Sequence, residues 1–134
     1  MKYIAIIILT HFISYQTYSQ TSRKYLDKGV LLVQKMKYKQ AMIEFNNAII
    51  LEPRNASAYY NRGTLKDILK DSKGAIADHS LAIKFKPDYS SAYNNRGFAK
   101  EHINDFRGAI SDYTKAIEIG QLDDVQMKCM RRQC

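Results

Sequence analysis

The sequence predicts an all-α protein made of three consecutive helix-turn-helix units, six helices in all, followed by a short C-terminal capping helix. Two observations predict this fold class. Residues 56–89 and 90–123 align without a gap and are identical at fourteen of thirty-four positions, and the same phase extends with fewer identities to residues 22–55. Within each unit, apolar residues recur at steps of three and four, which is the period of an amphipathic helix.

The first element in chain order, residues 1–19, has the layout of an export signal. Lys2 precedes an apolar run over residues 3–9, a polar stretch follows, and small residues stand just before Gln20. A basic start, a short apolar core and small residues at a cleavage position are the three parts of a secretory signal peptide. We therefore expect cleavage before Gln20 and export of the protein to the periplasm or the extracellular space.

Two alternatives to cleavage remain open for this segment. Residues 3–13 would serve as a retained membrane anchor, or the segment would form a buried first helix. The apolar run is shorter than the roughly 20 residues that a membrane-spanning helix needs, which favours the signal peptide.

Composition and charge narrow the classes of partner. The chain is 46% hydrophobic and 25% charged, as in an ordinary folded domain, and its formal net charge is +8. Removal of residues 1–19 takes away one lysine and no acid, which leaves 20 basic and 13 acidic side chains and a formal charge of +7. The basic residues are spread along the chain instead of clustering with aromatics, so no nucleic-acid partner is expected.

Each repeated unit is expected to consist of a first helix, a tight turn and a second helix. Short polar breaks at residues 36–38, 70–72 and 104–106 separate the two halves of each unit, and Asp71, Ser72, Asn104 and Asp105 in these breaks are candidate caps of the second helix. Pro53 and Pro87 stand at one phase and are expected to end the second helices of the first two units. The third unit has Gln121 at this phase, and a break is expected there too.

Small residues recur on both helices of each unit and predict that the two backbones approach closely. Glycine inside a helix costs about 0.5–1 kcal/mol relative to alanine, so its recurrence implies a compensating contact. The expected pairs are Gly29 with Ala41, Gly63 with Ala75, and Gly97 with Ala109. Rings are expected to fill the space around these contacts; they are Tyr25, Tyr59 and Tyr93 on the first helices and Phe45, His79 and Tyr113 on the second.

A thirty-four-residue unit with an early aromatic, a glycine four residues on, an alanine twelve after that and a late proline resembles the tetratricopeptide repeat family. The resemblance covers residues 22–123, as repeats 22–55, 56–89 and 90–123. It implies a right-handed superhelix whose first helices line a concave groove that holds peptides or partner helices. The sequence departs from the family where an aromatic usually follows the glycine by three residues, since it has Leu32, Lys66 and Lys100 there, and Ser72 replaces the aromatic seen as Tyr38 and Phe106.

Catalytic chemistry is not indicated. The chain has no glycine-rich phosphate loop, no paired-histidine metal helix and no nucleophile with a local signature, so we expect no catalytic residue, metal site or cofactor, and no small-molecule substrate. His79 stands at a core phase, and Asp78 and Asp112 are expected to pair with Arg62 and Arg96. An enzyme that uses Glu101 and His102 is the third and last hypothesis.

The leading hypothesis is therefore a binding module for a peptide or protein partner. By phase, the residues expected to face the groove are Leu26, Val30, Tyr60, Asn61, Thr64, Asp67, Asn94, Asn95, Phe98, Glu101 and His102. One subgroup of the family grips a C-terminal carboxylate with lysines, an arginine and asparagines. Here only Asn61 matches that clamp, since Leu26, Val30, Ser91 and Asn95 occupy its other positions, so such a ligand is disfavoured.

The last segment, residues 124–134, begins where a fourth unit would begin and is expected to cap the stack as a short amphipathic helix. Its polar end leaves open a second function, a structural or oligomerising role in an envelope-associated assembly. Cys129 and Cys134 would be free or form an intermolecular link, and the sequence leaves both possibilities open.

Overall fold

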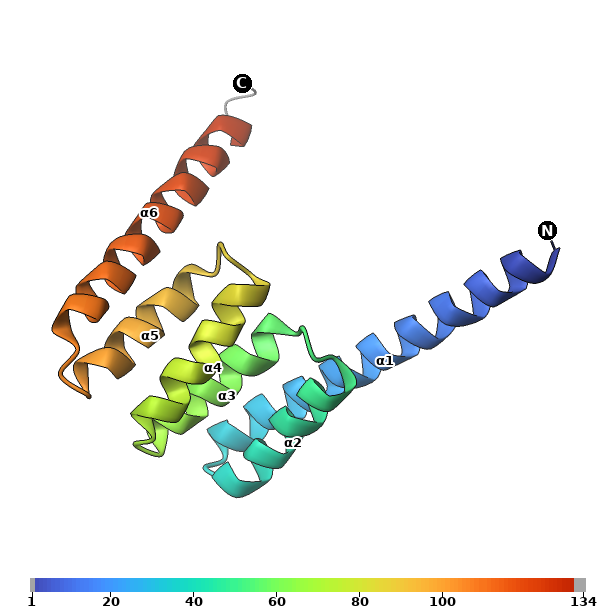
Figure 1. The fold of residues 1–134 in the computed structure, drawn as a ribbon, viewed down its shortest axis with the longest axis horizontal. Helices are drawn as coiled ribbons and strands as arrows, with labels where there is room; N and C mark the ends of the chain where they lie inside the picture. The colour runs from blue at the N-terminus through green and yellow to red at the C-terminus, as the bar shows by residue number, and fades with distance from the viewer. Residues whose placement is uncertain (1, 132–134) are drawn as a thin grey trace.

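The computed structural model describes the backbone of residues 2–131 and the side chains in this range other than residues 2, 3, 5, 11, 12, 15 and 122–131. The described chain folds into six helices: α1 (Lys2–Gln34), α2 (Tyr38–Leu51), α3 (Ala56–Ile68), α4 (Ser72–Phe85), α5 (Ser90–Glu101) and α6 (Phe106–Arg131). Helices α1 and α2, α3 and α4, and α5 and α6 form three antiparallel hairpins that stack in chain order (Figure 1). The predicted all-α helical-repeat fold is confirmed.

Small residues form the line along which the helices meet. Six alanines of the second helices are buried in register, two in each unit: Ala41, Ala48, Ala75, Ala82, Ala109 and Ala116. Phe45 and Leu65 are buried beside Ala41 in one apolar cluster. Since Leu65 lies in α3 and Phe45 in α2, this cluster joins the first unit to the second.

The repeated glycines of the first helices make room for a ring, which differs from the expected glycine–alanine pairs. A Cβ atom on Gly29 would lie 2.5 Å from Cε1 of Phe45, and one on Gly97 would lie 2.8 Å from Cε1 of Tyr113. At Gly63 the neighbour is the His79 ring, at 2.9 Å. The close approach was predicted correctly, but the nearest atoms belong to the ring of the second helix. Of the three expected alanines, only Ala109 contributes one of the three nearest atoms, since its backbone oxygen lies 3.2 Å from a Cβ atom on Gly97.

The helix ends follow the predicted signals in the first two units. Helices α2 and α4 end two residues before Pro53 and Pro87. At the starts of α4 and α6, Oδ1 of Asp71 and of Asp105 accepts a hydrogen bond from the backbone N–H three residues on, at 2.9 and 3.0 Å. The two predicted aspartate caps are thus confirmed.

Both ends of the chain are more continuous than expected. Helix α6 runs to Arg131 through Gln121, so the expected break and the separate capping helix after residue 123 are absent, because no proline or other helix breaker stands at this phase. Helix α1 likewise runs from Lys2 through the proposed cleavage position, and its N-terminal part projects from the stack (Figure 1). None of the described helices is long and apolar enough to cross a membrane.

Candidate functional site

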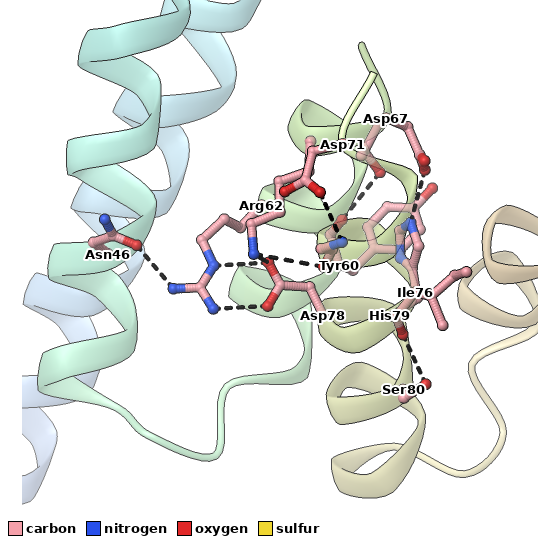
Figure 2. A network of polar contacts seen from close by, with 12 residues as sticks. Asn46, Tyr60, Arg62, Asp67, Asp71, Ile76, Asp78, His79 and Ser80 are labelled. Carbon is pink, nitrogen blue, oxygen red and sulfur yellow. Dashed lines mark hydrogen bonds and ion pairs between the residues drawn. The ribbon is translucent and has the colours of Figure 1, made fainter. Parts of the chain in front are cut away.

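A buried carboxylate in each of the last two units fixes the first helix against the second. Asp78 is 2% exposed and accepts hydrogen bonds from Nε and Nη2 of Arg62 at 2.8 and 2.7 Å (Figure 2), while Nζ of Lys66 lies 2.8 Å away. Burial alone would raise the pKa of Asp78, but the hydrogen bonds from Arg62 and Lys66 outweigh it and hold that pKa below its usual range. The predicted arginine–aspartate pair is confirmed.

The same cluster recurs one unit later. Arg96 donates from Nε and Nη2 to Asp112 at 2.8 and 2.6 Å, and Nζ of Lys100 lies 2.8 Å from the same carboxylate. Lys66 and Lys100 stand where the family commonly has an aromatic residue, and their pairing with the buried aspartates explains this departure.

Each arginine also reaches the preceding unit. Nη1 of Arg62 donates to Oδ1 of Asn46 in α2 at 2.8 Å (Figure 2), and Nη1 of Arg96 donates to Oγ of Ser80 in α4 at 3.1 Å. Each guanidinium therefore connects two units as well as the two helices of its own unit. Arg62 holds α3 against α2 and α4, and Arg96 holds α5 against α4 and α6.

A second polar pair, Asp67 with His79, lies between α3 and α4. Nε2 of His79 is 3.2 Å from Oδ2 of Asp67 (Figure 2), and the imidazole is fully buried, as predicted for a core histidine. Its Nδ1 is buried without a hydrogen-bond partner, and the Tyr60 ring lies 5.7 Å from the imidazole. Burial lowers the pKa of His79 more than Asp67 raises it, and burial raises the pKa of Asp67 despite the bond from His79.

Equivalent positions in the other units carry different chemistry. In the third unit, the hydroxyl of Tyr113 donates to Oε2 of Glu101 at 3.0 Å, while the first unit has Val33 and Phe45 at these positions. Burial and the nearby Glu101 carboxylate raise the pKa of Tyr113. The helix pairs are thus joined by an apolar contact, a carboxylate–imidazole contact and a carboxylate–phenol contact in turn.

The Asp67–His79 pair predicts a pH dependence of stability. Because the pKa of His79 is lower in the folded chain than its unfolded value of about 6.5, the unfolded chain binds more protons just below that pH and stability falls as the pH falls. The raised pKa of Asp67 acts in the opposite direction as the pH falls through that raised pKa, and Asp78 and Asp112 lose their stabilising effect only below their unfolded pKa values.

The double substitution Asp67→Val with His79→Phe recreates the first unit's apolar pair and removes this titration. We expect the free energy of unfolding to decline between pH 7.5 and 5.5 in the original chain, by an amount on the order of 1 kcal/mol, and to stay level in the double variant. Urea titrations followed by circular dichroism at four pH values measure both slopes. Equal slopes would show that another group titrates in this range.

The predicted groove contains an open hollow between the second and third units. It has a volume of about 640 Å³ and is lined by Tyr60, Ser90, Ser91, Asn94, Asn95, Tyr113, Ala116 and Ile117. None of these side chains carries a formal charge at neutral pH. The hollow therefore offers hydroxyl, amide and apolar surface, and no cation or carboxylate, to whatever enters it.

A second hollow of about 350 Å³ adjoins the first one through Asn95. Its lining consists of Thr64, Asp67, Ile68, Lys70, Asn95 and Phe98. The amide of Asn95 donates to the hydroxyls of Tyr60 at 3.3 Å and Thr64 at 3.2 Å, so it holds α5 against α3 where the two hollows meet. Six of the predicted groove residues thus lie in one continuous region: Tyr60, Thr64, Asp67, Asn94, Asn95 and Phe98.

The other predicted groove residues lie apart from these two hollows. Leu26 and Val30 are half-buried against the apolar cluster of the first unit, and Leu26 also lines a separate hollow of about 350 Å³ beside Glu52 and Asn55. Asn61 donates its amide to the backbone oxygen of Ser57 in its own helix, at 2.8 Å.

Glu101 and His102, the pair of the enzyme hypothesis, are exposed and face different neighbours. Glu101 accepts from Tyr113, whereas the His102 ring packs edge-on against Phe98 with its centroid 4.4 Å away. No cluster of three or more histidine, cysteine or acidic side chains suited to a metal occurs among the described residues.

The larger hollow is also lined by three residues of α6, the second helix of the third unit: Tyr113, Ala116 and Ile117. These three residues were not among the groove residues predicted from the sequence. The prediction took groove residues only from the first helix of each unit. In the described stack no further helix packs against α6, so Ile117 is exposed, whereas Ile49 and Ile83 at the same phase are half-buried beside the next unit.

Comparisons with known proteins agree with the repeat architecture. The family model described as "Tetratricopeptide repeat" matches residues 90–119. A search of curated protein sequences found no significant match. Among solved structures, the first tetratricopeptide domain of Spaghetti (RPAP3) bound to the HSP90 peptide SRMEEVD is 27% identical, with a TM-score of 0.74 over 75% of this chain and 80% of that one.

Two further structures share the fold at lower identity. The tetratricopeptide domain of Arabidopsis OM64 is 24% identical with a TM-score of 0.73, over 76% of this chain and 84% of that one. The TPR2B domain of yeast Sti1, solved as a complex with pHsp70, is 21% identical with a TM-score of 0.75, over 85% and 90% of the two chains. Together with the thirty-four-residue period and the six helices, these matches show that the chain is a tetratricopeptide repeat protein.

Proposed function

We propose that this protein is a non-catalytic interaction module that holds a peptide or a partner helix in its groove. The observation that carries the proposal is the pair of adjoining hollows that meet at Asn95, across α3, α5 and α6. Together they form an elongated polar and aromatic surface, which suits an extended chain better than a compact substrate.

The chemistry of the larger hollow favours an uncharged segment of the partner, whereas the adjoining hollow has one acidic and one basic residue, Asp67 and Lys70. The eight residues around the larger hollow are uncharged, and the ring of Phe98 in the adjoining hollow is 48% exposed. The similar Spaghetti domain holds an HSP90 peptide that ends in EEVD, an acidic tail. This chain has no lysine or arginine in its larger hollow to neutralise such a tail, so its ligand carries neutral polar and apolar side chains there.

Binding is expected to depend on Asn94 and Phe98, which are exposed in the groove and whose truncation leaves the core intact. The test captures partners from a lysate of the parent organism with the original chain and with the Asn94→Ala, Phe98→Ala variant. The control is Gln40→Ala with Ile43→Ala, two exposed positions on the outer side of α2. The proposal predicts that captured proteins are lost with the groove variant alone; retention by both variants would refute it.

Export is part of the proposal. It rests on the sequence of residues 1–19 and on the position of Ser22, the first residue of α1 that is buried among those whose side chains the structure describes. Ile4, Ile6 and Leu9 are exposed on the projecting part, so cleavage before Gln20 removes none of the side chains that the structure describes as buried. Intact-mass measurement of the protein from the parent organism should give a chain that starts at Gln20, and a chain that keeps Met1 would contradict cleavage.

A further inference from the structure

The outward face of α6 is the end of the helix stack. At the two internal junctions a second helix packs against the first helix of the next unit, α2 against α3 and α4 against α5. Helix α6 contacts α5 and no other described helix, and Figure 1 shows it at the edge of the stack. The same face of α2 and of α4 is covered by the first helix of the next unit.

Two apolar positions of this face show what is left uncovered. In α6 these positions are Ile110, which is 66% exposed, and Ile117, which is 61% exposed. The residues at the same two positions of α2 and α4 are half-buried, because the first helix of the next unit packs against them. The equivalent residues are Met42 and Ile76 for Ile110, and Ile49 and Ile83 for Ile117. Ile117 also borders the groove, whereas Ile110 lines none of the hollows described above.

A hydrogen-bond acceptor accompanies the apolar pair. Asn46 in α2 and Ser80 in α4 accept from the arginine of the following unit. The equivalent residue of α6 is Thr114, which is exposed and whose hydroxyl donates to the backbone oxygen of Ile110 at 2.8 Å. A threonine hydroxyl that donates one bond still has lone pairs to accept another, so this position also matches the internal junctions.

The internal junctions define the helix that fits this face. Helices α3 and α5 share three features at these junctions: a fully buried alanine, an arginine four residues later that donates to the preceding unit, and a buried small or apolar residue three residues after that. In α3 these are Ala58, Arg62 and Leu65, and in α5 they are Ala92, Arg96 and Ala99. Leu65 belongs to the cluster against which Met42, the counterpart of Ile110, is packed.

Two segments of this sequence stand at the corresponding phase of the repeat, one in α1 and one after residue 123. In α1 the residue at the alanine position is Lys24, which is exposed. If α1 of a second copy docked on α6, the charged ammonium group of Lys24 would be buried, which is strongly unfavourable. In the sequence of the C-terminal segment, Gln126 stands at the position of the alanine and Met130 at the position of the arginine. Neither segment carries the pattern of the internal junctions.

We propose that the end face formed by Ile110, Thr114 and Ile117 docks an amphipathic helix of a partner protein with the pattern alanine, arginine four residues on, and leucine or alanine three residues further. The docked helix extends the stack by one layer, with the arginine on the Thr114 hydroxyl and the apolar residue on Ile110. The end face shares Ile117 with the larger hollow of the groove, but the docked helix requires no contact with Asn94 or Phe98.

The test uses a lactam-bridged, fluorescein-labelled peptide with the sequence of residues 55–70, which carries the pattern of α3, and the full chain at increasing concentration. The matched control peptide has Ala58→Lys. The matched proteins are Ile110→Asp, at an exposed position, and the groove variant Asn94→Ala with Phe98→Ala. Fluorescence anisotropy measures binding, circular dichroism checks folding, and light scattering measures the mass of each protein alone.

We expect the peptide to bind the original chain and the groove variant equally, and to lose at least about tenfold in affinity for Ile110→Asp or with the Ala58→Lys peptide. Absence of saturable binding, or equal binding to Ile110→Asp, overturns the proposal. Loss of binding in the groove variant places the peptide in the groove and also overturns it. Self-association that Ile110→Asp abolishes would identify a second copy as the occupant and overturn it as well.

Discussion

Replacement of Asp78 by alanine is expected to lower the free energy of unfolding by about 3 kcal/mol. The carboxylate is almost completely buried and holds Arg62 and Lys66, whose side chains are only 20% and 21% exposed. Without it, two cations remain at a largely dry junction between α3 and α4, and the arginine loses the partner that aims it at Asn46. Urea denaturation followed by circular dichroism measures the loss.

The control for this prediction is an exposed ion pair within a single helix. Nζ of Lys115 lies 3.1 Å from Glu118, and both side chains are about half exposed, at 51% and 55%. Pairs of this kind contribute less than about 1 kcal/mol because water screens them and both side chains lose freedom. If Asp78→Ala costs no more than Lys115→Ala, the buried cluster does not hold the units together as we describe.

Substitution of Gly29 by alanine is expected to destabilise the chain by about 2 kcal/mol, although alanine is the better helix former. The new methyl group would lie 2.5 and 2.7 Å from Cε1 and Cδ1 of Phe45, and this ring is itself enclosed in the core of the first unit. Either the ring or the helix has to shift. Thermal unfolding of the variant measures the effect.

Gly120 provides the opposite case within the same chain. It lies inside α6 and a Cβ atom there would meet nothing within 4 Å, so Gly120→Ala is expected to stabilise by about 0.5–1 kcal/mol through helix propensity alone. A stabilising Gly29→Ala, or equal effects at both positions, would contradict the role of the repeated glycines as spaces for a ring.

The sequence was sufficient to predict the architecture and the arginine–aspartate clusters, because both depend on a fixed phase. Arg62 and Asp78 recur as Arg96 and Asp112 at the same separation, and a charged pair that repeats in this way has few alternatives. Phase alone did not reveal which neighbour a glycine faces, since the rings and the alanines of the second helix lie on adjacent turns. The direction of each side chain came only from the structure.

The Asp67–His79 contact shows a signal in the sequence that went unused. Positions 33, 67 and 101 change together with positions 45, 79 and 113, from valine with phenylalanine to aspartate with histidine and glutamate with tyrosine. A polar residue appears on one helix only when the other can hydrogen-bond to it. Comparison of the three units with one another would have predicted this contact, and with it a half-buried Asp67 in the groove.

Other features had no clear signal. Each turn within a unit has one residue with a positive φ, at Met36, Lys70 and Asn104, of which only asparagine commonly adopts this conformation. Phase placed six of the eleven predicted groove residues around the two adjoining hollows, but it gave no information on hydrogen bonds. The amide donors of Asn61 and Asn95 were expected to face a ligand, whereas both are bonded within the protein. Such bonds depend on distances that only the assembled stack sets.

The most direct test of the central claim is site-specific photocrosslinking in the groove. A benzophenone amino acid replaces Asn94, which is exposed and lines the larger hollow, or Ile43 on the outer side of α2, as the control. After irradiation of cells of the parent organism, mass spectrometry identifies the crosslinked species. An interaction module that uses its groove gives one discrete protein adduct at position 94 and none at position 43; no adduct at position 94, or the same adducts at both, would contradict it.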